Sequence, residues 1–236
     1  MKNTPIIALD FHSAEKTFEF LSAFDGDVHV KVGMQLYYKE GPAIVSRLKE
    51  LGYDVFLDLK LHDIPNTVKS AMEVLAGFGV DLVNVHAAGG KAMMEAALEG
   101  LDKGTPSGHK RPALIGVTQL TSTDDRQVRE EQLINVALRD SVLHYAQLTK
   151  SAGLDGVVCS VHESAVIQEA CGTEFLKVTP GIRLSDGGVH DQKRIATPEE
   201  ARLAGSTHIV VGRAITGAVD PRAAYEEINA LWKGLV

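Results

Sequence analysis

The sequence has little cysteine, few aromatic side chains and no long apolar runs. Its 236 residues include two cysteines, Cys159 and Cys171, one tryptophan and 6% aromatic residues. The two cysteines form neither a CxxC pair nor a disulfide framework, and this fits a reducing compartment best. No apolar stretch approaches the length of a membrane span, and the apolar run near the N-terminus is too short for a signal peptide. We therefore expect a cytoplasmic protein that makes no membrane contact.

Positive charge is also scarce, with 24 lysine and arginine residues against 31 acidic residues and a net charge of −7. This balance argues against a surface that binds nucleic acid. An anionic small molecule would instead be held by local arginines, lysines and backbone N–H groups. The segment after the first apolar run, "ALDFHSAEK", lacks the GxGxxG fingerprint of dinucleotide-binding folds.

Eight short apolar runs alternate with longer amphipathic stretches along the chain. Runs without polar alternation are typical of parallel strands that are covered on both faces. Gly52, Gly79, Gly153 and Gly205 stand where the intervening helices are expected to end. Eight βα units in a chain of this length predict an α/β fold, a (β/α)8 TIM barrel in one domain over residues 1–236, with a doubly wound open sheet as the alternative. The runs are 4–10, 27–33, 54–60, 81–87, 112–118, 155–160, 175–181 and 208–214.

Charged residues cluster at the expected ends of these strands, where the active sites of such barrels lie. Asp58 and Lys60 are two residues apart in "DVFLDLK", so their side chains leave the same face of a strand. Lys31 and Asp10 stand at the ends of two earlier runs, and Asp63 follows in a loop. Acids and lysines that alternate in one barrel mouth keep each other ionised. A buried charge network is costly to stability, so we predict that this one serves catalysis.

Three of these residues also have a simpler explanation. Asp63 precedes a proline and a predicted helix, which it is suited to cap. Asp10 is suited to cap the helix after the first strand, and the alkyl chain of Lys31 is long enough to reach solvent. We interpret His62 as a loop residue, and His86 as a packing or hydrogen-bonding residue at a strand end, not as a metal ligand.

The segments after the last two expected strands suit a phosphate group. They read "TPGIRLSDGGVHDQKR" and "VGRAI", and barrels of this type frequently bind phosphate with backbone N–H groups at these positions. Arg183 and Arg213 offer forked hydrogen bonds, Gly212 permits close approach of the backbone, and Gln192 is within reach from the longer loop. The glycines of that loop permit it to close. The alternative is a glycine-rich surface loop with solvated arginines.

Taken together, these segments resemble the bacterial type of the orotidine 5′-phosphate decarboxylase family, and the resemblance covers nearly the whole chain. Its most specific part is "DLKLHDIPNTV" (58–68). The other parts are "ALDF" (8–11), "KVGMQLY" (31–37), "QLTS" (119–122), "TPGIR" (179–183) and "VGRAI" (211–215). The resemblance implies a lyase without cofactor or metal that converts orotidine 5′-phosphate to uridine 5′-phosphate and CO2 in pyrimidine biosynthesis.

The resemblance also implies roles for individual residues. Lys60 would protonate C6 of the pyrimidine as CO2 leaves, and Asp58 would lie beside the substrate carboxylate. Lys31 and Asp10 would hold the ribose hydroxyls and complete the charge network.

The remaining implied roles concern a second subunit and the rest of the substrate. Asp63, Ile64 and Thr67 would reach the neighbouring active site of a homodimer. Thr121 would belong to the segment that recognises the pyrimidine. The phosphate would be bound by Arg183, Gln192, Gly212 and Arg213.

Three other functions compete with this interpretation. Sugar-phosphate enzymes related to 3-keto-L-gulonate 6-phosphate decarboxylase share DxKxxD, but they use magnesium and carry an acidic metal ligand where this chain has Lys31. A metal-dependent pentose-phosphate epimerase would require histidine and aspartate ligands on several strands, and only His86 is suitably placed. A nucleotide-binding barrel without catalytic activity would not need the set of Asp58, Lys60 and Asp63.

Overall fold

The computed structural model describes residues 4–24, 28–184 and 194–235, and its eight strands form a closed parallel barrel. The strands follow one another around the barrel in chain order, and β1 pairs with β8, with Ile6 opposite Val210, to close it. Each predicted apolar run coincides with one strand, with β3 extending one residue beyond its run, which confirms the (β/α)8 barrel. The strands are β1 (Ile6–Ala8), β2 (His29–Gly33), β3 (Asp54–Leu61), β4 (Leu82–His86), β5 (Ala113–Val117), β6 (Gly156–Val158), β7 (Leu176–Thr179) and β8 (His208–Val211).

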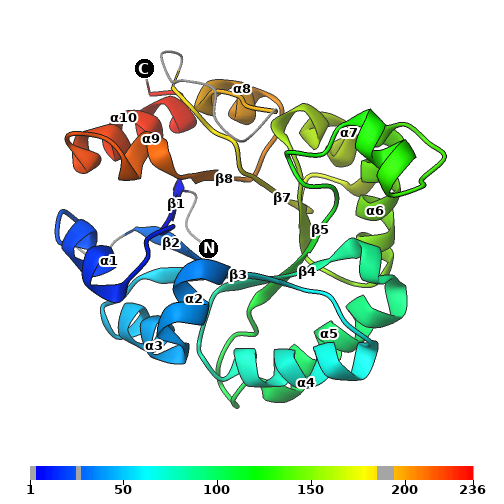
Figure 1. Cartoon of the computed structure of the whole chain (residues 1–236), viewed down its shortest axis with the longest axis horizontal. Coiled ribbons are helices and arrows are strands. Elements are labelled where there is room, and N and C mark those ends of the chain that lie inside the picture. The colour runs from blue at the N-terminus through cyan, green and yellow to red at the C-terminus, as the bar shows by residue number, and fades with distance from the viewer. Residues whose placement is uncertain (1–3, 25–27, 185–193, 236) are drawn as a thin grey trace.

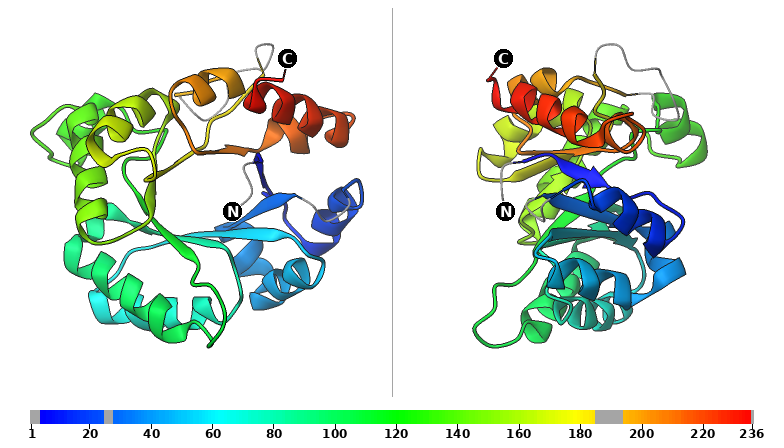
Figure 2. Two further views of the ribbon diagram at one scale, coloured as in Figure 1. Left: turned by 180° about the vertical axis from the view of Figure 1, so that it is seen from behind. Right: turned by 90° about the vertical axis from the view of Figure 1, so that its left-hand side faces the viewer.

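Helices surround the barrel on all sides, as Figure 1 shows along the barrel and Figure 2 from behind and from one side. The α-helices are α1 (Ala14–Leu21), α2 (Met34–Glu40), α3 (Pro42–Glu50), α4 (Pro65–Ala76), α5 (Lys91–Gly104), α6 (Leu138–Ser151), α7 (Val161–Cys171), α8 (Pro198–Leu203), α9 (Arg213–Thr216) and α10 (Pro221–Lys233). A 3-10 turn η1 (Ala87–Gly89) follows β4, and a π-helical turn η2 (Gln127–Glu131) follows β5. In the part of the chain that is described, no helix combines the length and apolar character needed to span a bilayer.

The predicted helix ends agree with the structure. Gly52, Gly153 and Gly205 directly follow the last capping residue of α3, α6 and α8, with φ between 82° and 85°. Gly79 lies two residues beyond the C-cap of α4 and has φ 68°. Glycine reaches these left-handed angles without the steric penalty of a side chain, so each helix ends and the chain turns into the next strand.

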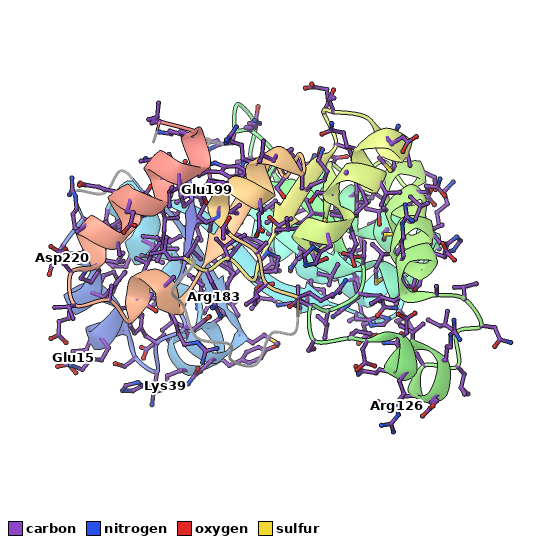
Figure 3. The ribbon with its side chains drawn as sticks, turned by 90° about the horizontal axis from the view of Figure 1, so that it is seen from above. Glu15, Lys39, Arg126, Arg183, Glu199 and Asp220 are labelled. Atoms are coloured by element: carbon purple, nitrogen blue, oxygen red, sulfur yellow. The ribbon has the colours of Figure 1, made fainter. Side chains whose placement is uncertain are left out.

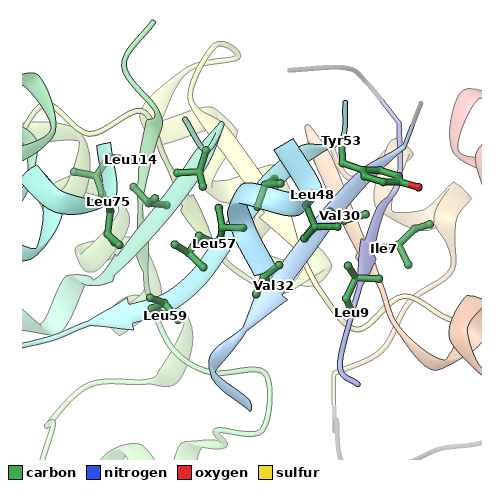
Figure 4. Close-up of a cluster of buried hydrophobic side chains, with 14 of the residues drawn as sticks. Ile7, Leu9, Val30, Val32, Leu48, Tyr53, Leu57, Leu59, Leu75 and Leu114 are labelled. Atoms are coloured by element: carbon green, nitrogen blue, oxygen red, sulfur yellow. The ribbon is translucent and has the colours of Figure 1, made fainter. Parts of the chain in front are cut away.

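The apolar side chains form two layers. Inside the barrel, Ile6, Phe56 and Ile115 belong to one buried cluster that fills its centre. A larger cluster lies between the strands and the helices; Figure 4 shows part of it, where Val30 and Leu57 on strands lie near Leu48 of α3. Because both faces of each strand are buried, the strands read as continuous apolar runs. All eight strands are parallel, so their carboxyl ends open at one end of the packed barrel.

Candidate active site

A cavity of about 510 Å³ lies at the carboxyl ends of the strands. Its floor is apolar, with Phe56, Val178 and Val210, and its walls carry charged groups from several strands. Parallel strands place residues that are far apart in the sequence around one opening, which explains how they meet. The cavity brings together eight of the predicted site residues: Asp10, Lys31, Asp58, Lys60, Thr121, Arg183, Gly212 and Arg213.

Four of these residues form a continuous chain of ion pairs. The ammonium nitrogen of Lys31 lies 3.1 Å from Asp10 Oδ1 and 3.3 Å from Asp58 Oδ2. The ammonium nitrogen of Lys60 lies 2.7 Å from the other oxygen of the Asp58 carboxylate. Acids and lysines therefore alternate, as the sequence predicted. The side chain of Lys31 is 12% exposed and lies between two carboxylates, so its ammonium group is paired and does not extend into bulk solvent.

Burial and charge act in opposite directions on the pKa values of this network. Burial alone disfavours the charged form of Lys31, but the carboxylates of Asp58 and Asp10 outweigh it and raise the pKa of Lys31. Burial likewise opposes ionisation of Asp58, but Lys31 and Lys60 outweigh it, and the pKa of Asp58 is lowered. Asp58 and Lys31 therefore stay ionised at neutral pH.

Asn84 on β4 completes the network, and the sequence analysis did not identify it. Its Nδ2 donates a 2.7 Å hydrogen bond to Asp58 Oδ1, and its Oδ1 accepts a 2.8 Å hydrogen bond from the backbone N–H of Lys60. The side chain is buried, 1% exposed. The signal was a single amide inside the apolar run "LVNVH", because a buried polar group requires a partner.

The alternative capping roles of the acids are wrong. Helix α1 is capped by Ser13, whose side chain accepts from Lys16 N, so Asp10 is free of that role. The N-cap position of α4 is Ile64, without a side-chain cap, and Asp63 instead accepts a 2.6 Å hydrogen bond from the backbone N–H of Ile64. The expected proline in the first turn of α4 is confirmed.

Asp63, Ile64 and Thr67 lie outside the cavity of their own chain. All three are exposed, and Ile64 is 66% exposed. The structure therefore does not bring these three predicted site residues together with the cluster around Lys60 in the same chain.

The described residues predicted to bind phosphate, Arg183, Gly212 and Arg213, follow β7 and β8, which lie across the barrel from β3 and β4. Arg183 is 9% exposed, and its Nη1 donates a 2.8 Å hydrogen bond to the carbonyl oxygen of Ile182. Figure 3 places Arg183 well inside the edge on which Glu15, Lys39 and Arg126 lie. Gly212 is the N-cap of α9, and Arg213 is its first residue. Gln192 lies outside the described residues, as do Gly187 and Gly188 of the same loop.

Arg194 links three segments around the cavity and was also missed. It donates a 2.9 Å hydrogen bond to the carbonyl oxygen of Leu120 and a 3.3 Å bond to Ser160 Oγ. It also forms an ion pair with Glu163, which is buried in the capping box of α7. Leu120 lines the cavity next to Thr121, so Arg194 anchors that wall. No pattern around Arg194 distinguishes it from a solvent-exposed arginine.

The two histidines near the cluster pack against each other. The rings of His62 and His86 have centroids 5.5 Å apart. Burial, together with His62 and Lys60, lowers the pKa of His86, so it stays neutral. Within the described ranges, no group of three or more histidine, cysteine, aspartate or glutamate side chains is placed to hold a metal ion.

The closed barrel and its charged mouth place the chain in the class of (β/α)8 barrel proteins with a cavity at the carboxyl ends of the strands. Residues 3–228 match the model of the Orotidine 5′-phosphate decarboxylase / HUMPS family, and the chain belongs to this family.

Relatives of full length agree with this assignment. The chain is 64% identical to an orotidine 5′-phosphate decarboxylase of Lysinibacillus sphaericus, over 99% of this chain and 100% of that protein. It is 59% identical to one of Geobacillus thermodenitrificans, over 98% of both proteins. A crystal structure of orotidine 5′-phosphate decarboxylase from Lactobacillus acidophilus superposes with a TM-score of 0.89 at 44% identity, covering 98% of this chain and 99% of that one.

Proposed function

We propose that this chain is an orotidine 5′-phosphate decarboxylase, a carboxy-lyase that forms uridine 5′-phosphate and CO2 in de novo pyrimidine biosynthesis. The observation that carries the proposal is the chain of ion pairs from Asp10 to Lys60 in a cavity that also holds Arg183 and Arg213. Relatives that share 59–64% of the sequence over their full length bear this name. The whole chain, residues 1–236, would act as one catalytic unit in the cytoplasm, without membrane or nucleic-acid partners.

The proposed chemistry uses no cofactor and no metal. When the bond from C6 to the carboxylate breaks, the electron pair stays on C6 in the plane of the ring, where the ring does not delocalise it. The site must therefore supply electrostatic stabilisation and an acid. Lys60 has the ammonium group for both, and it transfers a proton to C6 as CO2 leaves. Asp58, 2.7 Å from Lys60, keeps that ammonium oriented.

Binding of the rest of the substrate follows the layout of the cavity. Asp10 and Lys31 would hold the ribose hydroxyls, and Thr121 would contact the pyrimidine. The phosphate would be bound on the far side from Lys60, so that its binding energy is available to hold the reacting carbon in place. The groups proposed for the phosphate are Arg183, Gln192, Gly212 and Arg213.

We further propose a homodimer in which Asp63, Ile64 and Thr67 reach the partner's cavity. All three are exposed and lie outside the cavity of their own chain, and Ile64 is a large apolar residue on the surface. An acid from the partner near Lys60 would add a second carboxylate beside the ammonium group. Mixing inactive Lys60→Ala with inactive Asp63→Ala should restore activity, because each mixed dimer then contains one intact site. The sedimentation coefficient of Ile64→Asp should be that of a monomer.

The experiment that tests the reaction is a spectrophotometric assay with orotidine 5′-phosphate in excess EDTA. We expect rapid loss of the substrate absorbance with the wild type, and a rate lower by at least about 10³-fold with Lys60→Ala. Lys49→Ala is the matched control, because Lys49 pairs with Asp81 outside this cavity and its loss should leave the rate unchanged. Turnover that requires added Mg²⁺ would instead favour a sugar-phosphate enzyme.

The residues present do not suit that second function. The ammonium of Lys31 lies between the carboxylates of Asp10 and Asp58, where its charge repels a divalent cation. A barrel that only binds nucleotides is also disfavoured, because it has no use for a proton donor paired with a buried acid.

A further inference from the structure

We infer that Asn84 is a positioning residue that sets the geometry of Lys60 and Asp58; this inference rests on the proposed decarboxylase function. Asn84 lies at the centre of β4, is buried, and does not line the cavity. Both ends of its amide group bind the catalytic cluster. Nδ2 donates to the Asp58 carboxylate, and Oδ1 accepts from the backbone N–H of Lys60.

Asn84 can bind the backbone of Lys60 because the pairing of β3 with β4 is irregular at this point. Leu57 pairs with Val83, but the next pair is Leu61 with Val85. Residues 58–60 of β3 therefore stand opposite Asn84 alone, and the regular ladder of backbone hydrogen bonds is interrupted. The side-chain oxygen of Asn84 takes the place of a backbone acceptor for the N–H of Lys60.

Lys60 has φ 53°, in the left-handed region that is unfavourable for a residue with a Cβ atom. Such a conformation persists only where the surroundings hold it in place. The hydrogen bond from Lys60 N to Asn84 Oδ1 holds the backbone at this point. From this backbone the side chain of Lys60 lines the cavity.

The two hydrogen bonds of Asn84 both constrain the position of the Lys60 ammonium group. Asp58 Oδ1 accepts from Asn84 Nδ2 and also from the ammonium group of Lys60, each at 2.7 Å. Asn84 therefore fixes both the backbone from which Lys60 extends and the carboxylate that its ammonium group contacts. An asparagine side chain carries a donor and an acceptor on one planar group, which neither leucine nor an ionised aspartate provides.

The experiment compares Asn84→Leu with wild type and with Ser206→Ala. Ser206 is a buried residue outside the cavity, and its hydroxyl bonds to Ser164 and Thr179. We expect Asn84→Leu to lower kcat by about 100-fold, because Nζ of Lys60 is displaced from the reacting carbon. The Kd of uridine 5′-phosphate should change by less than about 3-fold, because the phosphate and ribose contacts remain. Ser206→Ala should keep the wild-type kcat even if its melting temperature falls.

Asn84→Asp separates a positioning role from a purely structural one. When the introduced carboxyl group is ionised, it places a second carboxylate against Asp58, whereas its protonated form donates a hydrogen bond to Asp58 as the asparagine amide does. Two carboxylates that share a site raise the pKa of one of them. The kcat of Asn84→Asp relative to wild type should therefore rise as the pH falls. Asn84→Asp also serves as the test variant if Asn84→Leu does not fold.

Crystal structures of the variants give a readout that does not depend on activity. In Asn84→Leu, Lys60 should leave the left-handed region and its ammonium group should move away from Asp58. An unchanged Lys60 conformation, or a kcat within about 3-fold of wild type while the wild type decarboxylates its substrate, would overturn the role of Asn84 and leave the proposed function intact. An inactive wild type with a displaced Lys60 in the variant would refute the proposed function alone.

Discussion

The ammonium nitrogen of Lys31 lies 3.3 Å from a carboxylate oxygen of Asp58, and the two side chains are 12% and 11% exposed. Two opposite charges at this distance, withdrawn from water, hold each other ionised. The pKa of Lys31 is raised and that of Asp58 is lowered for this reason, against the effect of burial. The pair therefore acts as a fixed dipole in the wall of the cavity.

Replacing Asp58 by asparagine keeps the shape of the side chain and removes its charge. Lys31 and Lys60 then lose the carboxylate between them, and we expect kcat to fall by at least about 100-fold. The pKa of Lys31 should fall, because the Asp58 charge that helps to offset burial is gone. The alkaline loss of activity should therefore begin at a lower pH than in the wild type. Pre-steady-state assays across pH measure both effects. Asp54→Asn, at the start of the same strand, should keep the wild-type kcat; an equally active Asp58→Asn would remove Asp58 from the mechanism.

Gly33 leaves room for the Lys31 side chain. A Cβ atom at this position would lie 3.0 Å from Lys31 Nζ and 3.4 Å from Asp10 Oδ1. The backbone of Gly33 has φ −90°, which alanine also adopts, so Gly33→Ala should fold normally. We expect the displaced Lys31 to raise KM by about 10-fold, measured by initial rates and by calorimetry with uridine 5′-phosphate. Gly77→Ala, with φ −68° and its nearest neighbour at 3.4 Å, is the matched control and should behave as wild type.

The burial of His29 predicts that acid destabilises the barrel. It is fully buried, its ring nitrogens have no hydrogen-bond partner among the described residues, and burial lowers its pKa to about 3. His208, also buried, has a pKa lowered to about 4. The unfolded chain binds protons at these groups below the ordinary value of 6.5 and the folded chain does not, so stability is complete above that pH and falls as the pH decreases toward the folded values.

The variant His29→Leu should lack the share of the acid-induced loss of stability that is due to His29. At pH 4.5 its free energy of unfolding should exceed that of wild type by about 2–3 kcal/mol, and the difference should be smaller at pH 7.5. Urea denaturation at both pH values measures this, with the exposed His144→Gln as a control that should follow wild type. Parallel losses of stability in wild type and His29→Leu would show that His29 is not the acid-sensitive group.

Arg194 holds the wall of the cavity through the carbonyl oxygen of Leu120. Arg194→Met removes that bond and leaves Glu163 buried without its cation, which should destabilise the fold by about 3–5 kcal/mol and raise KM. Adding Glu163→Gln should recover most of the stability, because no unpaired charge remains. It should not recover KM, because Leu120 still lacks its donor. Thermal unfolding and initial rates on the single and double variants distinguish the two effects; a normal KM in the double variant would show that the Leu120 contact is unimportant.

The order of strands and helices follows from local patterns that the sequence carries in full. The apolar runs, the glycines at 52, 153 and 205, and the polar faces of the helices each specify a local element, and eight repeats of one unit permit few folds. The approach of Asp10, Lys31, Asp58 and Lys60 was predictable for the same reason, since each stands at the end of a strand and parallel strands end together.

The contacts made by side chains across the barrel were not predictable from local patterns. Asn84 is 26 residues from Asp58, and Arg194 is 74 residues from Leu120. The left-handed conformation of Lys60 lies within the irregular pairing of β3 with β4, which no residue type in "DVFLDLK" signals. Helix capping by Ser13, in preference to Asp10, likewise depended on where α1 begins.

The sequence by itself determined that this protein is a (β/α)8 barrel and which charged residues surround its opening, because strand and helix periods and strand-end positions are local properties. The tertiary structure decided the distances among those charges, the burial that sets their pKa values, and the two polar residues, Asn84 and Arg194, that hold the site in place. Those quantities depend on the register between neighbouring strands and on close packing, and these arise only when all eight units close into one barrel.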